Sequence, residues 1–197
     1  MKTLRKPLSS RRRQGLRKTR GGSKIYNTSG QIKNLNEKFQ GMDFFRKMVG
    51  STREHAIAKI LQEHPHPNIV NIYQVKDKYI DIEMVKPITD NVVFPDDQMV
   101  LLVAAMRKAK DHLQSLGIMY VDWKPDNAGL SVDGQYKLFD FDASGIVGKS
   151  KKWNISPPVY YWSYSQAVAN GKTDPVEIDD FAFDIGLVRK DYTPIIT

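Results

Sequence analysis

The chain contains no cysteine, which excludes disulfide bonds, a thiol nucleophile and zinc sites with cysteine ligands. No apolar run approaches the roughly 20 residues that a membrane-spanning helix needs. The N-terminus is basic and lacks the apolar core of a signal peptide. We therefore expect an intracellular protein, cytoplasmic or nuclear, that has no membrane partner.

Acidic side chains are absent from the first part of the chain. Residues 1–24 hold ten Lys or Arg and no Asp or Glu, whereas the remainder holds 20 basic and 22 acidic residues, a net charge of −2. The pI near 9.5 therefore comes from the N-terminal segment. Such a charged segment with few apolar residues is typical of disorder, and we expect a disordered tail over residues 1–22. Two interpretations stay open: a solubilising arm, or a contact between residues 1–24 and nucleic acid or another polyanion.

The rest of the 197-residue chain has enough apolar residues for a packed core in one domain or one two-lobed unit. Its periodicity alternates between strands and helices. Ser51 and Glu54 have capping-box spacing at the start of one helix. We expect strands at 24–28, 43–49, 68–75 and 78–85, helices at 51–64, 98–116 and 178–188, and a hairpin at 128–142.

Two acidic motifs, "YVDWKPDN" and "LFDFD", flank the turn of the last hairpin. A tight hairpin allows such motifs to face each other. Asn127 and Asp140 offer the hard oxygen ligands that suit Mg²⁺. Asp122 could accept the proton of a hydroxyl group, and Lys124 could neutralise charge on a phosphoryl group. The two motifs therefore indicate phosphoryl transfer.

At these motifs the sequence resembles the eukaryotic-type Ser/Thr protein kinase family, whose catalytic loop reads H-R-D-L-K-x-x-N and whose metal motif reads D-F-G. "HPNIV" resembles the join between the family's C-helix and fourth strand. "DDFAFD" resembles the start of its F-helix, where Asp179 would brace the catalytic loop. The resemblance implies an α+β, protein-kinase-like two-lobed fold, with a small β-rich N-lobe at 23–85 and a shortened, mainly helical C-lobe at 86–197.

The resemblance also implies transfer of the γ-phosphoryl group of ATP, with Mg²⁺, to Ser or Thr hydroxyls of protein substrates. Asp122 would act on the hydroxyl proton and Lys124 on the moving phosphoryl group, while Asn127 and Asp140 would hold Mg²⁺.

Lys47 and Glu54 are the candidates for the family's lysine–glutamate pair, in which the lysine holds the α- and β-phosphates. A plainer interpretation makes Lys47 a strand-edge charge and Glu54 a capping-box residue. Lys33 and Lys38 are the alternative lysines.

The nucleotide would meet two further segments of the chain. "IEMV" resembles the hinge between the lobes, where the backbones of Glu83 and Val85 would bind adenine. "GGSKIY" is the best remnant of a glycine-rich loop, which assigns Gly21 and Gly22 to the phosphates.

Several positions depart from the family pattern. Tyr120 and Val121 replace the His and Arg before the catalytic aspartate, and Asp142 replaces the glycine of D-F-G. Without that Arg, we expect activity that does not depend on phosphorylation of segment 143–158. The helices that follow the F-helix in the family are not evident, which indicates a minimal or truncated kinase. The Arg-rich, Gly-Gly tail resembles those of compact kinases of large DNA viruses, so a viral, virion-associated protein is one expectation.

Two other functions remain open. An acidic residue at position 142 is common in small-molecule phosphotransferases of the aminoglycoside or choline kinase type. The weak glycine loop would also fit a pseudokinase that serves as a binding module.

Overall fold

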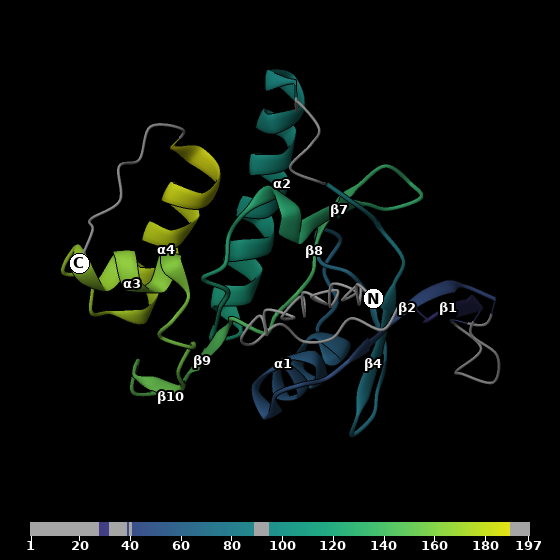
Figure 1. The fold of residues 1–197 in the computed structure, drawn as a ribbon, viewed down its shortest axis with the longest axis horizontal. Helices are drawn as coiled ribbons and strands as arrows, with labels where there is room; N and C mark the ends of the chain where they lie inside the picture. Colours follow the sequence, from purple (N-terminus) through teal and green to yellow (C-terminus); the bar gives the residue numbers. More distant parts are fainter. Residues whose placement is uncertain (1–27, 32–38, 40, 89–94, 190–197) are drawn as a thin grey trace, which may run out of the picture.

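The first part of the fold is a four-stranded antiparallel sheet with one helix packed against it (Figure 1). The computed structural model describes residues 28–31, 39, 41–88 and 95–189. The sheet has the order β1-β2-β4-β3. Its strands are β1 (Thr28–Gln31), β2 (Asp43–Met48), β3 (Ile72–Val75) and β4 (Tyr79–Glu83). The three strands predicted between 43 and 85 are confirmed, with shorter bounds, whereas most of the strand predicted at 24–28 lies outside the described residues.

Helix α1 (Thr52–Glu63) confirms the helix predicted at 51–64. The Ser51 hydroxyl accepts a hydrogen bond from the backbone N–H of Glu54 at 3.2 Å, which caps the first turn. The buried side chains of Ile57 and Leu61 face β3 and the core. Glu54 of the same helix is also buried, so its carboxylate lies in the interior of the fold.

Helix α2 (Asp96–Ser115) is the long helix predicted at 98–116. Leu102, Met106 and Leu113 recur at helical spacing and are fully buried or nearly so. Gly117 follows the helix with φ +73°, a conformation that glycine adopts without steric cost.

Two smaller sheets have three strands each; all of these strands except β5, which precedes α2, lie between α2 and the C-terminal helices in the sequence. One has the order β5-β7-β8 and contains the predicted hairpin, with Gly134 at φ +77° in its turn. The other has the order β10-β9-β6 and was not predicted. Their strands are β5 (Lys86–Pro87), β6 (Ile118–Met119), β7 (Ala128–Leu130), β8 (Tyr136–Leu138), β9 (Gly145–Val147) and β10 (Trp153–Ile155).

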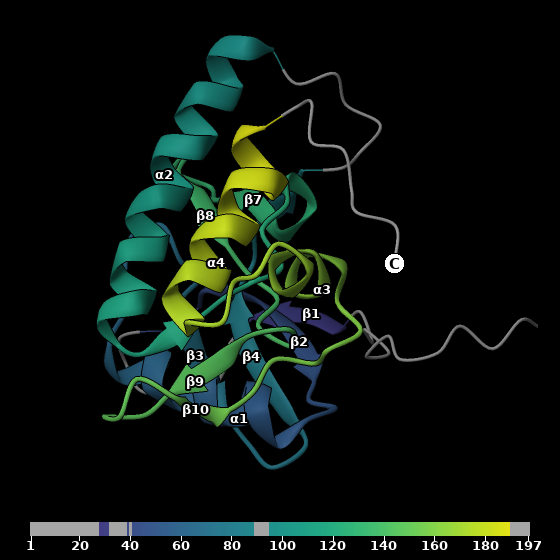
Figure 2. The same cartoon turned by 90° about the vertical axis from the view of Figure 1, so that its left-hand side faces the viewer.

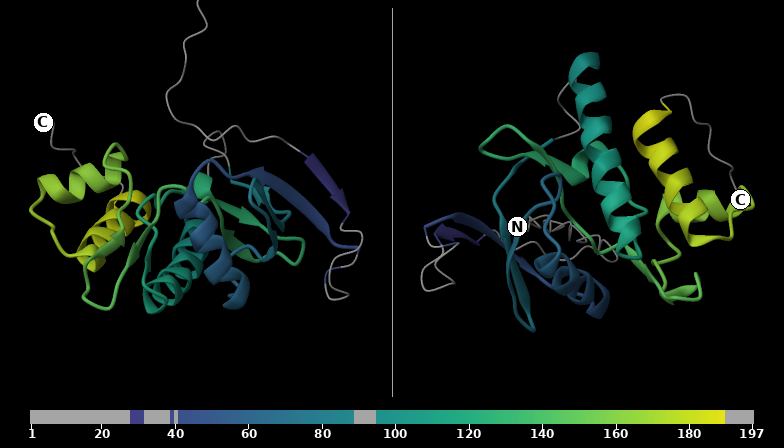
Figure 3. Two further views of the ribbon diagram at one scale, coloured as in Figure 1. Left: turned by 90° about the horizontal axis from the view of Figure 1, so that it is seen from below. Right: turned by 180° about the vertical axis from the view of Figure 1, so that it is seen from behind.

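Two C-terminal helices, α3 (Trp162–Ala169) and α4 (Pro175–Phe183), pack against each other. They lie on the side of α2 away from β1 and β2 (Figures 1 and 3). Helices α2 and α4 run side by side (Figure 2), and the Lys110 ammonium of α2 contacts the Asp180 carboxylate of α4 at 2.5 Å. The helix predicted at 178–188 begins earlier than expected, at Pro175. After Phe183 it continues as a π-helical turn over Asp184–Val188.

One hydrophobic core joins these parts, from Ile57 and Ile80 through Leu113 to Phe183. The described chain is thus a mixed α/β structure with small sheets and helices, which is compatible with the predicted kinase-like fold. None of the helices in its described part combines the length and apolar character needed to cross a bilayer.

Candidate active site

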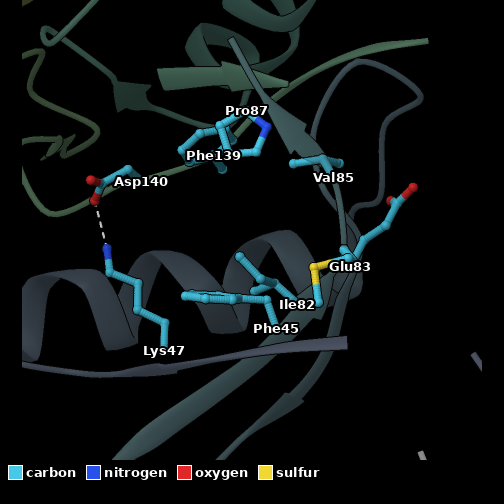
Figure 4. A pocket seen from close by; sticks show the side chains of 9 residues that line it. Phe45, Lys47, Ile82, Glu83, Val85, Pro87, Phe139 and Asp140 are labelled. Atoms are coloured by element: carbon cyan, nitrogen blue, oxygen red, sulfur yellow. Dashed lines mark hydrogen bonds and ion pairs between the residues drawn. The ribbon is translucent and has the colours of Figure 1, made fainter. Parts of the chain in front are cut away.

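A cavity of about 220 Å³ lies between the four-stranded sheet and the segment that follows β8 (Figure 4). Most of its surface is apolar. At one end, the charged side chains of Lys47 and Asp140 face each other. The segment from Ile82 to Val85 forms the other end. The lining residues are Phe45, Lys47, Ile82, Glu83, Met84, Val85, Pro87, Phe139 and Asp140.

Lys47 connects the sheet to two acidic residues. It lies in β2 opposite Ile80 of β4, and its side chain is buried. Its ammonium donates hydrogen bonds to Glu54 of α1 and, at 2.5 Å, to Asp140. Glu54 is thus more than a cap: its backbone N–H binds Ser51 while its carboxylate binds Lys47. The strand-edge interpretation of Lys47 does not fit this burial.

The ionisation of this cluster follows from its burial. Burial alone would lower the pKa of Lys47, but the charges of Asp140 and Glu54 outweigh it and the pKa is raised. Burial raises the pKa of Glu54, and the nearby Lys47 offsets only part of that effect. Lys47 therefore stays cationic at the inner end of the cavity, where a bound anion would meet it.

Glu83 and Val85 lie where the chain passes from β4 to β5. The Glu83 carboxylate accepts hydrogen bonds from the side chains of Asn71 and Lys137, each at 2.8 Å. These contacts fix the segment from both sides and leave Val85 against the cavity. Gly129 of β7 packs so closely on Val85 that any Cβ at position 129 would lie 2.8 Å from its Cγ2 atom. The segment between β4 and β5 is therefore rigidly held.

The "YVDWKPDN" segment forms a tight loop after β6. Lys124 pairs with the Asp122 carboxylate at 2.9 Å. The Asn127 side-chain amide donates to both the carboxylate and the backbone carbonyl of Asp122, each at 2.8 Å. Burial lowers the pKa of Lys124, but the hydrogen bond and charge of Asp122 more than compensate, so the pKa is raised. Asp122, Lys124 and Asn127 thus form one hydrogen-bonded unit.

The two acidic motifs converge, as the sequence predicts. The backbone N–H of Phe139 donates to the carbonyl of Asn127 at 3.0 Å. Burial, and then the charges of Asp140 and Asp122, raise the pKa of the Tyr120 hydroxyl. That hydroxyl donates to the carbonyl of Phe139 at 2.5 Å. Tyr120, the first residue of one motif, is therefore bonded to Phe139 of the other and joins the two.

Backbone strain is concentrated at this convergence. Val121 has φ +70° and Asp140 has φ +64°, the left-handed region that residues other than glycine rarely adopt. Such conformations cluster at functional sites. Val121 directly precedes Asp122, the proposed catalytic aspartate. Asp140 is itself a proposed metal ligand.

The residues fit a magnesium ion that is bound mainly through a nucleotide. The described chain contains no cluster of three or more His, Cys, Asp or Glu side chains able to hold a metal. Mg²⁺ in phosphoryl-transfer enzymes commonly takes one or two protein oxygens, the rest coming from phosphates and water. One carboxylate from Asp140 and one amide oxygen from Asn127 match that smaller set.

Some parts of the site are new relative to the sequence prediction. Phe45, Ile82 and Phe139 form apolar walls of the cavity that the sequence did not identify. The alternation of inward-facing and outward-facing residues along β2 and β4 could have indicated Phe45 and Ile82. The Tyr161 hydroxyl donates to Asp142 at 3.0 Å, a contact that no motif predicts. Gly21, Gly22, Lys33 and Lys38 lie outside the described residues.

No family model matches the chain, but it is similar to known protein kinases. It is 32% identical over 136 residues to cGMP-dependent protein kinase 2 of Mus musculus, covering 62% of this chain and 18% of that protein. It is 30% identical over 130 residues to ribosomal protein S6 kinase alpha-3 of Homo sapiens, covering 60% and 18%. It is 27% identical over 149 residues to ribosomal protein S6 kinase alpha-1 of Mus musculus, covering 70% and 21%.

The chain therefore spans about a fifth of the length of the curated relatives it matches. The similarity supports a protein-kinase-like relationship over roughly 60% of the chain. The relatives named here are animal proteins, and they give no support to the expected viral origin.

Proposed function

We propose that this chain is a protein-kinase-like phosphotransferase that moves the γ-phosphoryl group of ATP, with Mg²⁺, to Ser or Thr hydroxyls of protein substrates. The observation that carries the proposal is the position of Lys47, buried at the inner end of the cavity and bonded to both Glu54 and Asp140. A buried cation between two carboxylates, beside an apolar cavity, suits a nucleotide, whose aromatic base packs against apolar side chains and whose phosphates are anionic.

Each proposed residue has a separate task. The backbone at Glu83 and Val85 would bind the adenine edge, and Lys47 would hold the α- and β-phosphates. Asp140 and Asn127 would hold Mg²⁺, which when bound neutralises charge on the phosphates.

The chemical step falls to the loop after β6. Asp122 would accept the proton of the attacking hydroxyl, and Lys124, paired with it at 2.9 Å, would stabilise the transferred group. Gly21 and Gly22 would cover the phosphates.

The proposal includes a two-lobed architecture. The N-lobe would comprise residues 23–85 with the four-stranded sheet and α1, and the C-lobe residues 86–197. The passage from β4 to β5, at the segment from Glu83 to Val85, supports a boundary there because residues that precede it and residues that follow it both line the cavity.

The test is a transfer assay with labelled ATP and Mg²⁺, with casein and myelin basic protein as acceptors. Asp122→Asn should lower turnover about 100- to 10,000-fold, the usual contribution of general acid–base groups. Asp111→Asn, an exposed aspartate on α2, is the matched control and should keep wild-type turnover. Wild-type turnover in Asp122→Asn would contradict the assignment.

The same assay separates the alternative functions. Phosphorylation of choline or an aminoglycoside in place of protein would show a small-molecule phosphotransferase. Nucleotide binding without transfer to any acceptor would show a pseudokinase. Asp142, acidic where the protein kinase pattern has glycine, is the feature that favours the small-molecule alternative.

A further inference from the structure

Tyr161 and Asp142 connect the two ends of the segment between the metal motif and α3. Tyr161 directly precedes α3, and its hydroxyl donates a hydrogen bond to the Asp142 carboxylate at 3.0 Å. Strands β9 and β10 lie between these residues and pair with each other. The contact therefore closes the whole of segment 143–161 into a loop beside Asp140.

Asp142 also contacts α1. The Arg53 guanidinium donates to the backbone carbonyl of Asp142 at 3.2 Å. Arg53 precedes Glu54, whose carboxylate binds Lys47. One residue thus links α1, the proposed metal ligand Asp140 and the start of α3.

Charge explains why Asp142 needs a hydrogen-bond donor. Asp142 is half-buried and lies two residues from Asp140, so its carboxylate is partly removed from water and accepts the hydrogen bond from Tyr161. Burial and the charge of Asp142 in turn raise the pKa of Tyr161, so that its hydroxyl stays protonated and able to donate. Loss of the hydroxyl would leave a partly buried carboxylate beside Asp140 with less compensation.

Protein kinases that use an Arg before the catalytic aspartate can hold this segment through a phosphate, but Val121 occupies that position here. The hydrogen bond between Tyr161 and Asp142 joins the two ends of segment 143–161 without phosphorylation of that segment.

We propose that Tyr161 is a positioning residue whose hydroxyl, bonded to Asp142, holds segment 143–161 in place beside Asp140 without phosphorylation of that segment. This inference rests on the proposed kinase function. Tyr161 does not touch the reacting atoms in this scheme; it acts through Asp142.

The first test compares Tyr161→Phe with Tyr160→Phe. Tyr160 is the matched control because it is 72% exposed, stacks on the Tyr161 ring and makes no hydrogen bond through its hydroxyl within the described residues. Tyr161→Phe should lower kcat about tenfold or more, the effect of one hydrogen bond to a charged group, with little change in KM for ATP. Phosphatase treatment of the wild type should leave turnover unchanged. Equal turnover in the two variants, or a large loss after phosphatase treatment, would overturn the proposal.

A double-mutant cycle tests whether the two residues act together. Asp142→Asn keeps an oxygen that accepts the Tyr161 hydrogen bond, so it should retain most activity, and adding Tyr161→Phe should lower it. In Asp142→Gly, which restores the glycine of the kinase pattern, Tyr161→Phe should have no further effect. Equal, additive losses in both backgrounds would overturn the proposal.

Amide hydrogen exchange gives a measurement that does not depend on activity. Residues 143–161 should exchange faster in Tyr161→Phe than in Tyr160→Phe, whereas α1 and α2 should not change. A wild type without turnover overturns the proposed function, and the exchange experiment still decides the positioning role: faster exchange supports it and equal exchange overturns it.

Discussion

The buried carboxylate of Asp179 in α4 accepts a hydrogen bond from the backbone N–H of Val121 at 2.9 Å, across 58 residues of sequence. The same oxygen accepts from the indole N–H of Trp123 at 2.8 Å. Val121 is β-branched with φ +70°, a conformation that costs about 1–3 kcal/mol. Asp179 therefore holds the strained backbone of Val121 on one side of Asp122 and the side chain of Trp123 on the other. The sequence predicts that Asp179 braces this loop, and Asp179 does contact it.

Asp179→Ala should destabilise the fold by at least about 2 kcal/mol, because it leaves two buried N–H donors without an acceptor. Asp179→Asn keeps an oxygen for these bonds and should cost less. Glu177→Ala, an exposed residue of the same helix, should stay within about 0.5 kcal/mol of wild type. Urea unfolding midpoints measure all three. A similar midpoint for Asp179→Ala and Glu177→Ala would show that the loop does not depend on this carboxylate.

Asp140→Ala and Asp122→Asn should separate binding from chemistry. Asp140 contacts Lys47 at 2.5 Å and is the proposed Mg²⁺ ligand, so its loss should weaken nucleotide affinity and remove its dependence on Mg²⁺. Asp122→Asn should leave affinity nearly intact while turnover falls. Calorimetric titration with ATP at low and high Mg²⁺ measures the difference. Unchanged, Mg²⁺-dependent affinity in Asp140→Ala would exclude Asp140 as the ligand.

Gly186→Ala should be strongly destabilising. A Cβ at this position would overlap the backbone carbonyl of Trp123, so the π-helical turn after α4 could not pack against the loop. Overpacking of this kind costs about 1–3 kcal/mol or more. Gly148→Ala is the control, since its nearest atoms would lie 3.8 Å away. Thermal unfolding of the two variants tests the prediction, which fails if they melt together.

Elements with a strong local signal could be predicted from the sequence. Helix α1 has a cap at Ser51, and α2 has an apolar stripe that ends at Gly117. The hairpin of β7 and β8 has its turn at Gly134. In each of these elements the local preference and the tertiary packing agree, which is the condition under which sequence patterns are reliable.

Elements without a local signal were missed. Helix α3 starts at Trp162, and Tyr161 before it provides no side-chain cap; the aromatic residues around this start have no clear helical period. Strands β6, β9 and β10 have two or three residues each and exist only through pairing with distant segments. The contact between Tyr161 and Asp142 depends on that pairing, so the sequence could show Asp142 as unusual but could not identify its partner.

The stability of the protein should decrease in mild acid through His66. Burial, and then the charges of His112 and Lys108, lower the pKa of His66 below its ordinary value of 6.5. Its Nδ1 atom accepts a hydrogen bond from the backbone N–H of Asn68 at 3.2 Å, which requires an unprotonated nitrogen. The unfolded chain therefore binds the proton more readily, and stability is lost as the pH falls from about 6.5 through the folded-state pKa.

Unfolding midpoints in urea between pH 7.5 and 5 measure this dependence. His66→Gln should flatten the profile over this range. Lys108→Gln removes one of the charges that oppose protonation and should flatten it in part. An unchanged profile in His66→Gln would assign the acid sensitivity to other groups.

The basic segment 1–24 should bind polyanions, and we propose nucleic acid as the probe. It carries ten positive charges against a net −2 for the remaining chain. Each phosphate neutralised releases counterions. With 6–10 phosphate contacts, a rise in salt from 50 to 200 mM would therefore weaken binding about 1,000-fold or more, with little sequence preference.

Titration of labelled duplex DNA and RNA with the full chain and with a variant lacking residues 1–20 measures this binding. The truncated protein should lose the binding and keep its circular dichroism spectrum, because the segment offers little apolar surface to a core. Equal affinity in both proteins would leave the segment only a solubilising role.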